Sequence, residues 1–303
     1  MKLFAPEYYK EFTCIADKCK HSCCIGWEID VDGDTMEKYK SCREEYGKNI
    51  LESIEDGETP CFRLGEAERC PHLNDRGLCR IILEVGEDYL CHICREHPRF
   101  YNDSPKGREV GLGMACEEAC RIILFSDGYR DFKEIAEVCG QPQDWDFDTL
   151  VHRERIYGIL CDRSRSYTER LERIYEEYGV TPSAFSDEEW IETLESLEYL
   201  NSDHKELFES YSSVSDTPQK IENQLERALA YFVYRHCTEA EDAYGFCAAL
   251  GFCLFCERLI ASLCRANEGD ITDFARIVSE ELEYSVDNTE EIKAKFEFLT
   301  FGG

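Results

Sequence analysis

Cysteine is the residue whose number and spacing in this sequence point to chemistry. Nineteen of the 303 residues are Cys, and twelve of these fall in the first 120 positions. Four thiols lie within eleven residues near the start, in the pattern Cys14-x4-Cys19-x3-Cys23-Cys24. They can converge on one metal centre if the chain wraps tightly around it. Because neighbouring side chains diverge in most backbone conformations, we expect Cys24 to face either a second centre or the core.

A second set of cysteines follows between residues 70 and 120. Its members are Cys70, Cys79, Cys91, Cys94, Cys116 and Cys120. Of their spacings, Cys91-x2-Cys94 has that of a zinc knuckle, whereas the set as a whole does not match the paired CxxC motifs of a zinc ribbon. The CxxxCxxC motif of radical enzymes is also missing, since Gly26 stands at its third position. Irregular spacing with many thiolates favours an iron–sulfur cluster slightly over tetrahedral zinc, and both stay open.

Other cysteines and the nearby histidines have simpler interpretations. Cys42 and Cys61 are as easily small buried hydrophobic residues as ligands. On the apolar segment near the C-terminus, thiols are expected to be core atoms, although Cys253-x2-Cys256 has metal-pair spacing. These are Cys247, Cys253, Cys256 and Cys264. Histidines among the thiols are expected to support ligands or lie on the surface, with one able to complete a mixed shell. They are His21, His72, His92 and His97.

The sequence also restricts the compartment and the partners. The opening residues, MKLFAPEYYKEF, lack the apolar run of a secretory signal peptide, so we expect a cytoplasmic protein with free thiols rather than disulfides. No apolar run is free of charge for long enough to span a membrane. A net charge of −30 argues against nucleic acid and anionic membranes and favours a partner that presents lysines. The oligomeric state is left open.

The elements that must position these residues change in character along the chain. Residues 1–125 are predicted to be an irregular cysteine-rich domain with short helices at 35–46, 78–85 and 116–125, and turns at 74–77 and 102–105. Residues 145–303 are predicted to be a helical bundle, because apolar residues recur there with a period near 3.6. The expected helices cover 150–178, a segment capped at Ser186, one opened by Thr217-Pro218, 241–266, 270–283 and 289–299. No alternating strand pattern is present, so the fold class is mainly α.

Several of these motifs together resemble a known family. The run Phe12-Thr13-Cys14, Cys19 and Cys23-Cys24-Ile25-Gly26-Trp27-Glu28-Ile29-Asp30 resembles the opening of the bacterial flagellin lysine-N-methylases. That family belongs to a wider set of proteins with a cysteine-rich domain that chelates zinc or iron. The resemblance continues in Cys70-Pro71-His72-Leu73, Leu78-Cys79, Gly86-Glu87, Leu90, Cys94, Pro98-Arg99 and Ala115-Cys116-Glu117-Glu118-Ala119. Glu117 replaces the family's usual proline, and His97 stands where an aromatic residue is common. The resemblance covers about 115 residues.

The resemblance implies a set of ligands and an activity. The family's shared cysteines fall on Cys14, Cys19, Cys23, Cys24, Cys70, Cys79, Cys94 and Cys116. Eight thiolates suffice for one four-iron cluster with a structural remainder, or for two four-ligand sites. The implied reaction is methylation of flagellin lysines by S-adenosylmethionine. The sequence has no glycine-rich GxGxxG turn to hold that cofactor, Gly111-Leu112-Gly113 being the nearest approach, and no catalytic base can be singled out. The alternative is a non-enzymatic iron–sulfur or zinc module for redox sensing or protein interaction.

Overall fold

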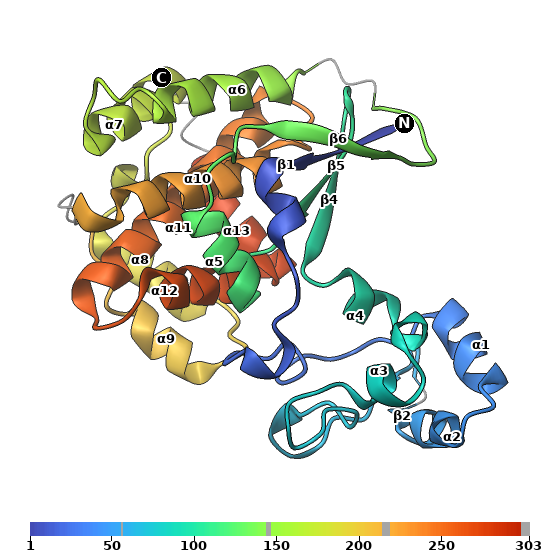
Figure 1. Ribbon diagram of the computed structural model, residues 1–303. Coiled ribbons are helices and arrows are strands. Elements are labelled where there is room, and N and C mark those ends of the chain that lie inside the picture. The colour runs from blue at the N-terminus through green and yellow to red at the C-terminus, as the bar shows by residue number, and fades with distance from the viewer. Residues whose placement is uncertain (56, 144–146, 214–218, 298–303) are drawn as a thin grey trace. The chain divides into compact units, whose positions relative to one another are not determined.

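The computed structural model describes residues 1–55, 57–143, 147–213 and 219–297 (Figure 1). The chain forms two compact units. The first, here called the helical unit, comprises Met1–Phe12, Phe100–Ala115 and Ala119–Gly303. The second, here called the cysteine unit, comprises Thr13–Arg99 and Cys116–Glu118. This division differs from the expected one of 1–125 and 145–303, because the N-terminal strand and residues 100–115 belong to the helical unit.

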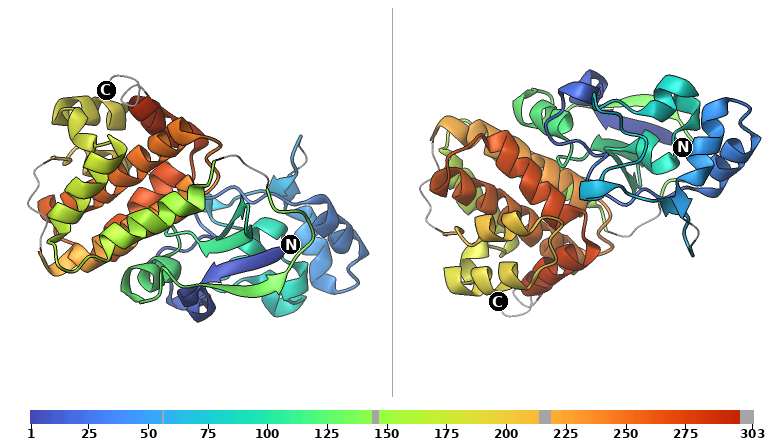
Figure 2. Two further views of the ribbon diagram at one scale, coloured as in Figure 1. Left: turned by 90° about the horizontal axis from the view of Figure 1, so that it is seen from above. Right: turned by 90° about the horizontal axis from the view of Figure 1, so that it is seen from below.

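The helical unit consists mainly of helices around a long apolar one (Figure 2). Its helices are α5 (Glu117–Phe125, which begins in the cysteine unit), α6 (Thr149–Leu160), α7 (Tyr167–Tyr178), α8 (Asp187–Ser196), α9 (Ser202–Phe208), α10 (Glu222–Cys237), α11 (Ala243–Ala266), α12 (Ile271–Val278) and α13 (Val286–Glu297). By length and composition α11 is apolar enough to cross a membrane, but 89% of its apolar window is buried in the structure. It therefore forms the core of this unit, and the predicted mainly α class is confirmed.

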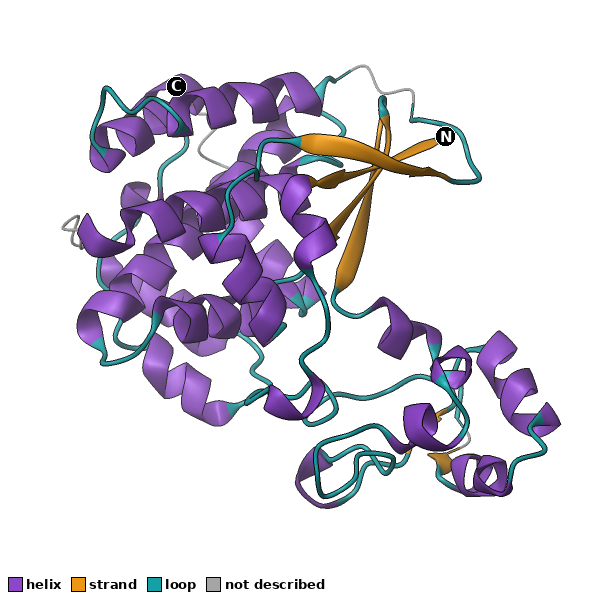
Figure 3. Cartoon of the chain, viewed as in Figure 1, coloured by secondary structure: helices purple, strands orange, loops and turns teal. Residues whose placement is uncertain are grey.

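A small mixed sheet in the helical unit was not predicted (Figure 3). Its strands, in the order β4-β5-β1-β6, are β4 (Arg99–Ser104), β5 (Gly107–Leu112), β1 (Lys2–Pro6) and β6 (Phe132–Glu137). β1 pairs with β5 in parallel and with β6 antiparallel. The expectation of no strands was wrong because β5 is buried almost throughout, and a strand covered on both faces does not alternate.

The cysteine unit consists of short elements. They are α1 (Gly33–Ser41), α2 (Glu45–Glu52), α3 (Arg80–Glu84), α4 (His92–Glu96), and the paired strands β2 (Ile54–Glu55) and β3 (Cys61–Phe62). Single helical turns of the 3₁₀ type connect them at η2 (Ala16–Lys18), η3 (Glu66–Glu68) and η4 (Glu87–Tyr89). Its core combines aromatic and aliphatic side chains with thiols. The buried members are Ile29, Val31, Tyr39, Tyr46, Ile50, Phe62, Cys70, Leu73, Ile81 and Cys91.

Local capping chemistry explains where several predicted helices differ from the observed ones. The expected helix 150–178 is divided into α6 and α7 because Ser166 and Glu169 form a capping box that starts a new helix. The expected helix 35–46 is divided into α1 and α2, and its N-cap is Asp32, whose carboxylate accepts from the Thr35 NH at 3.0 Å. The capping box at Ser186 is confirmed.

The remaining helix predictions near the C-terminus differ in detail. Asp270 caps α12, which passes into a π-helical turn, η7 (Ser279–Glu283), so 270–283 is not one regular helix. Thr217-Pro218 and Leu299 lie outside the described residues. The turn expected at 102–105 is mostly strand, because β4 continues to Ser104 before the chain turns at Pro105 and Lys106.

Candidate metal centre

All eight predicted ligands lie in the cysteine unit. Residues 14–94 are part of its long segment, and Cys116 belongs to the short segment Cys116–Glu118, which joins it from a distant part of the sequence. Cys42, Cys61 and Cys91 lie in the same unit, whereas Cys120 belongs to the helical unit. The thiols of the cysteine unit divide into two groups that differ in burial and in neighbours.

The first group, here called the exposed thiol group, consists of Cys14, Cys19, Cys23 and Cys116. Cys14 and Cys23 are exposed, and Cys19 and Cys116 are half-buried. Three of the four lie on the loop around η2, and the fourth immediately precedes α5.

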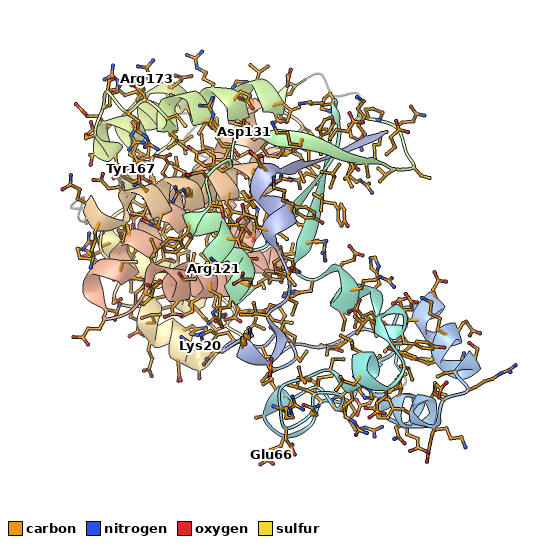
Figure 4. The ribbon with its side chains drawn as sticks, viewed as in Figure 1. Lys20, Glu66, Arg121, Asp131, Tyr167 and Arg173 are labelled. Atoms are coloured by element: carbon orange, nitrogen blue, oxygen red, sulfur yellow. The ribbon has the colours of Figure 1, made fainter. Side chains whose placement is uncertain are left out.

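Glu117 joins these two segments. Its Oε2 accepts hydrogen bonds from the backbone NH groups of Lys20, labelled in Figure 4, and His21 at 2.8 and 3.2 Å. The same oxygen lies 3.6 Å from the Cys19 Sγ. Glu117 departs from the resembled family's proline, and in this structure its carboxylate holds Cys116 against the 19–21 segment.

Neighbouring thiolates contribute to raised pKa values in the exposed group. Burial raises the pKa of Cys19 to about 11, with Glu117 and the Cys116 thiolate adding to the shift. The pKa of Cys23 is raised strongly, first by its hydrogen bond to Cys24 and by burial, and then by Cys24, Cys116 and Cys14. The Cys19 and Cys23 thiols, whose pKa values are raised, ionise more readily when a cation supplies the opposing charge.

The second group, here called the buried thiol group, consists of Cys24, Cys70, Cys79, Cys91 and Cys94. Cys70 and Cys91 belong to the core of the unit, and the other three pack against that core. Cys91, which the resemblance left out, is fully buried. Its CxxC spacing to Cys94 was the sequence signal for including it.

Backbone pairing brings this group together. The Cys70 NH donates to the Cys24 carbonyl at 2.9 Å, beside an isolated antiparallel bridge between Ile25 and Arg69. A second bridge pairs Leu73 with Cys79. The intervening turn is closed by Asn74, whose side chain accepts from the Arg76 and Leu78 NH groups. The predicted turn at 74–77 is therefore the feature that returns the chain to Cys79.

Helix α4 supplies the last two thiols of the buried group. Cys91 is the N-cap of α4 and Cys94 lies in its first turn, so both sulfurs meet on one side. The Tyr39 hydroxyl lies 3.3 Å from the Cys91 Sγ, and both residues are fully buried. Asp32 aligns this helix with α1, because its Oδ2 accepts from the His92 NH at 2.8 Å.

The thiols of the buried group also influence one another's pKa values. Burial raises the pKa of Cys70 to about 12, with further contributions from Cys24, Cys79 and Cys91. The pKa of Cys94 is raised by its hydrogen bond to Cys91 and by burial, and Cys24 and Cys70 add to the shift. Cys24 differs, because the hydrogen bond from Cys23 lowers its pKa to about 7 against the effect of burial. Nearby Ser22 and Arg69 act in the same direction.

The His72 ring is held by other side chains of the cysteine unit. Both ring nitrogens of His72 are occupied, Nδ1 by the Tyr46 hydroxyl at 2.8 Å and Nε2 by the Ser53 hydroxyl at 2.9 Å. Burial and the neighbouring Arg80 lower the pKa of His72 to about 4, so the ring is neutral and structural. His21 and His92 have exposed side chains and contribute their backbone NH groups to Glu117 and Asp32.

Cysteines outside the two groups have other neighbours. Cys42 packs so closely on Gly47 that a Cβ there would lie 2.9 Å from the Cys42 Sγ, and Cys61 lies on β3 beside Glu28. In the helical unit, the Cys237 and Cys253 sulfurs are 3.8 Å apart between α10 and α11, and Cys256 is equally buried. These thiols occupy space in an apolar core, as expected for α11.

Two further clusters that sequence reasoning missed lie in the helical unit. His204 Nδ1 is 2.5 Å from Glu281 Oε1, and Glu280 is nearby. However, the Glu281 carboxylate already accepts from the Leu200 and Asn201 NH groups, so it is satisfied internally.

The other cluster surrounds Glu283 on η7. Its carboxylate receives the Tyr231 hydroxyl at 3.0 Å and lies 2.6 Å from His236 Nε2, with Arg235 beside it. Tyr231, Arg235 and His236 share α10, whereas Glu283 lies 47 residues after His236, so no local motif joins the carboxylate to its partners. The carboxylate is thus compensated by its own neighbours.

The segment Gly111-Leu112-Gly113, which comes nearest to a glycine-rich cofactor-binding turn, is explained by packing. A Cβ on Gly111 would lie 2.3 Å from the Phe100 ring and 2.7 Å from the Tyr234 ring, so β5 requires glycine there. Gly111 is therefore a contact point within the helical unit and not part of a phosphate-binding turn.

Part of the chain is similar to three Salmonella proteins. The chain is 27% identical over 126 residues to proteins named lysine-N-methylase from Salmonella typhimurium and Salmonella choleraesuis, covering 39% of this chain and 31% of each relative. It is 28% identical over 126 residues to the flagellar biosynthetic protein FliU of Salmonella muenchen, covering 39% of this chain and 75% of that protein. The match thus spans about a third of the length of the two methylases. No family model and no solved structure matches the chain.

Proposed function

We propose that this chain is a protein-lysine N-methyltransferase of the cytoplasm that acts on flagellin and uses S-adenosylmethionine. The observation that carries the proposal is the similarity to relatives named lysine-N-methylase and to a flagellar biosynthetic protein. We further propose that the cysteine unit holds a metal centre through its thiolates.

The reaction places two demands on the chain. The lysine Nζ lone pair attacks the sulfonium methyl carbon, the carbon–sulfur bond breaks, and S-adenosylhomocysteine leaves. The amine must be neutral to attack, so a base must take its proton, or a desolvating pocket must lower its pKa until the proton is lost to water. A net charge of −30 supports attraction of a lysine-bearing protein, because an acidic surface raises the local concentration of cationic partners.

The donor sets fit a thiolate-bound metal. Both groups are sulfur-only, which suits zinc and iron–sulfur clusters. Among the described residues, no three thiols have sulfurs all within 4.8 Å of one another. The donor type admits tetrahedral zinc and an iron–sulfur cluster alike, and metal analysis with a visible spectrum on protein prepared without oxygen distinguishes them. When bound, either group contributes its binding energy to the folding of the cysteine unit.

The test is methyl transfer with isotope-labelled S-adenosylmethionine and the flagellin of the same organism. The protein should be prepared without oxygen and with its metal content measured. Label on flagellin lysine, lost when the lysines are acetylated beforehand, is the expected result. Metal-replete protein that repeatedly leaves flagellin unlabelled contradicts the proposal. If that protein bleaches with dithionite and shows no S-adenosylmethionine binding by calorimetry, the redox module replaces the enzyme.

A further inference from the structure

One histidine of the helical unit is held at one ring nitrogen by a buried carboxylate. His236, near the end of α10, has its Nε2 2.6 Å from the Oε1 of Glu283 on η7. We propose that His236 Nδ1 accepts a hydrogen bond from the substrate lysine amine during methyl transfer, and that Glu283 positions the ring for this role. The inference rests on the proposed function, because it names a residue that contacts the substrate of that reaction.

The surroundings of Glu283 determine which ring nitrogen of His236 carries the proton. Burial acts to raise the pKa of the Glu283 carboxyl, but Arg235, His236 and Ser279 together lower it, so the group is ionised. A carboxylate only accepts hydrogen bonds, so Nε2 is the nitrogen that donates. Burial lowers the pKa of His236, and Arg235 and Lys293 act in the same direction against the opposing effect of the carboxylate. The ring is therefore neutral near pH 7, and its Nδ1 keeps a lone pair.

Neighbouring side chains hold both members of this pair in place. The Tyr231 hydroxyl donates to Glu283 Oε2 at 3.0 Å and accepts from Arg235 Nη1 at 2.9 Å. The His236 ring packs edge-on against the Phe252 ring at a centroid distance of 4.7 Å. Rotation of the imidazole would break its bond to the carboxylate and its contact with Phe252. The direction of the Nδ1 lone pair is therefore fixed before a substrate arrives, as an acceptor in a reaction site requires.

The Nδ1 atom can be reached from outside the helical unit. The side chains of His236 and Arg235 are 11% and 14% exposed, whereas that of Glu283 is fully buried. Within the described ranges, the hydrogen bond to Glu283 through Nε2 is the one that the His236 ring makes. Nδ1 is also not one of the enclosed polar atoms that lack a partner, so it is open to solvent. A donor from another molecule can approach this nitrogen without displacing a partner.

An acceptor in this position suits a lysine amine. The Nζ atom must be neutral, because its lone pair forms the bond to the methyl carbon. The positive charge of Arg235 acts on the His236 ring, and it disfavours an ammonium ion there relative to the neutral amine. By accepting one N–H of that amine, Nδ1 directs the Nζ lone pair toward the methyl group.

The same contact strengthens as the reaction proceeds. The methyl carbon leaves sulfur, the electron pair of the broken bond stays on sulfur, and Nζ becomes positively charged. Both amine protons remain on Nζ, and none moves to His236 in this step. Because a hydrogen bond from a charged donor is stronger than one from a neutral donor, Nδ1 stabilises the transition state more than the bound substrate.

The experiment combines methyl transfer with nitrogen-15 NMR of the full-length, metal-replete protein. Wild type, His236→Gln, Glu283→Gln and His204→Gln are assayed with labelled S-adenosylmethionine and flagellin. Glutamine at position 236 keeps an amide N–H for Glu283 and removes the ring acceptor. The value of kcat should therefore fall about ten- to hundredfold, the equivalent of one hydrogen bond to a charged group, with a smaller change in KM. Nitrogen shifts of the wild-type ring near pH 7 should show Nε2 protonated and Nδ1 bare.

His204→Gln is the matched control. His204 also pairs with a carboxylate of η7, because its Nδ1 lies 2.5 Å from Glu281 Oε1. This variant removes a histidine–carboxylate pair from the same turn and should keep the wild-type kcat. Glu283→Gln should lower kcat and also shift the proton of the His236 ring between its two nitrogens. A purely structural role of Glu283 would leave that spectroscopic signature unchanged. Circular dichroism checks that each variant is folded.

Three results overturn the inference alone. The first is a wild-type kcat in folded His236→Gln. The second is a wild-type ring that carries its proton on Nδ1, or on both nitrogens, near pH 7; this measurement needs no variant and decides even if His236→Gln fails to fold. The third is an equal loss of kcat in His204→Gln, which would assign the effect to the stability of η7. Wild-type protein that leaves flagellin unlabelled refutes the proposed function instead, and the inference falls with it.

Discussion

The two units of this chain use the same residue type for opposite purposes. In the helical unit, Cys237, Cys253 and Cys256 lie between long helices and contact apolar neighbours. In the cysteine unit, thiols crowd one another between elements of which the longest helix has nine residues. The difference shows that cysteine serves as a small apolar residue of the core where long helices already bury apolar surface. Where the elements are short, we propose that cysteine binds the metal that holds them together.

The test with the largest expected effect is removal of the metal that we propose for the cysteine unit. Structural zinc contributes roughly 10 kcal/mol or more to the folding of small cysteine-tied domains. Chelation should therefore expose residues 13–99 to trypsin, while the helical circular dichroism of α10 and α11 persists. Limited proteolysis followed by mass spectrometry measures this. Equal protection of residues 13–99 before and after chelation would show that the unit is held by its apolar core alone.

The converse test damages the helical core. Trp190 is fully buried, stacks on Phe255 at a centroid distance of 3.9 Å and donates to the Pro182 carbonyl. Trp190→Ala should lower the free energy of unfolding of the helical unit by about 3–5 kcal/mol because it leaves a cavity. Urea denaturation followed by circular dichroism measures the change. Metal content should stay at the wild-type value, and a loss of metal would mean that the two units do not fold independently.

A buried carboxyl makes the stability of the helical unit depend on pH. Burial raises the pKa of Glu257 from 4.5 to about 7, although the Tyr167 hydroxyl, 2.8 Å away, and Arg258 favour the charged form. The Tyr167 position on α7 is marked in Figure 4. Because the folded state holds this proton more tightly than the unfolded state, stability falls as pH rises from about 4.5 to about 7 and is level above.

Glu257→Gln tests this dependence. The amide keeps the shape and the acceptor for Tyr167 but cannot ionise, so the variant should be more stable than the wild type at pH 8, by up to roughly 3 kcal/mol. The difference should shrink toward pH 5. Thermal or urea unfolding at several pH values measures it, and a pH-independent difference would assign the effect to packing.

The smallest expected effect is that of a cysteine used only for packing. Cys247 lies half-buried on α11, with its Sγ 3.9 Å from the Tyr178 carbonyl. Cys247→Ala should change the unfolding free energy by about 1 kcal/mol or less and leave the metal content unchanged. Metal analysis of this variant beside Cys94→Ser sharpens the contrast. A loss of metal from Cys247→Ala would mean that α11 also carries a ligand.

Local chemistry made part of this structure predictable. The capping box at Ser186 and the apolar segment 241–266 are short-range signals, and both appear as expected. The sheet depends on the pairing of β1 with β5 and β6, more than a hundred residues later in the chain. Such long-range pairing leaves no periodic signal when the strand is buried on both faces.

The cysteine-rich segment could be recognised from the sequence, but the arrangement of its thiols could not. The eight cysteines implied by the family resemblance all lie in the cysteine unit. The division into two groups depends on the Cys24–Cys70 backbone hydrogen bond and on the Glu117 anchor. Neither contact is encoded in the spacing of the thiols, because both link segments that the sequence keeps apart.

The insertion of the cysteine unit between β1 and β4 has a consequence for synthesis on the ribosome. The nascent chain carries β1 first, but its partner strands follow only at residues 107–112 and 132–137. All members of the buried thiol group have emerged by residue 94, whereas the exposed group waits for Cys116. Since chains fold from the N-terminus as they are made, we expect the buried thiol group to be complete before the sheet of the other unit can close.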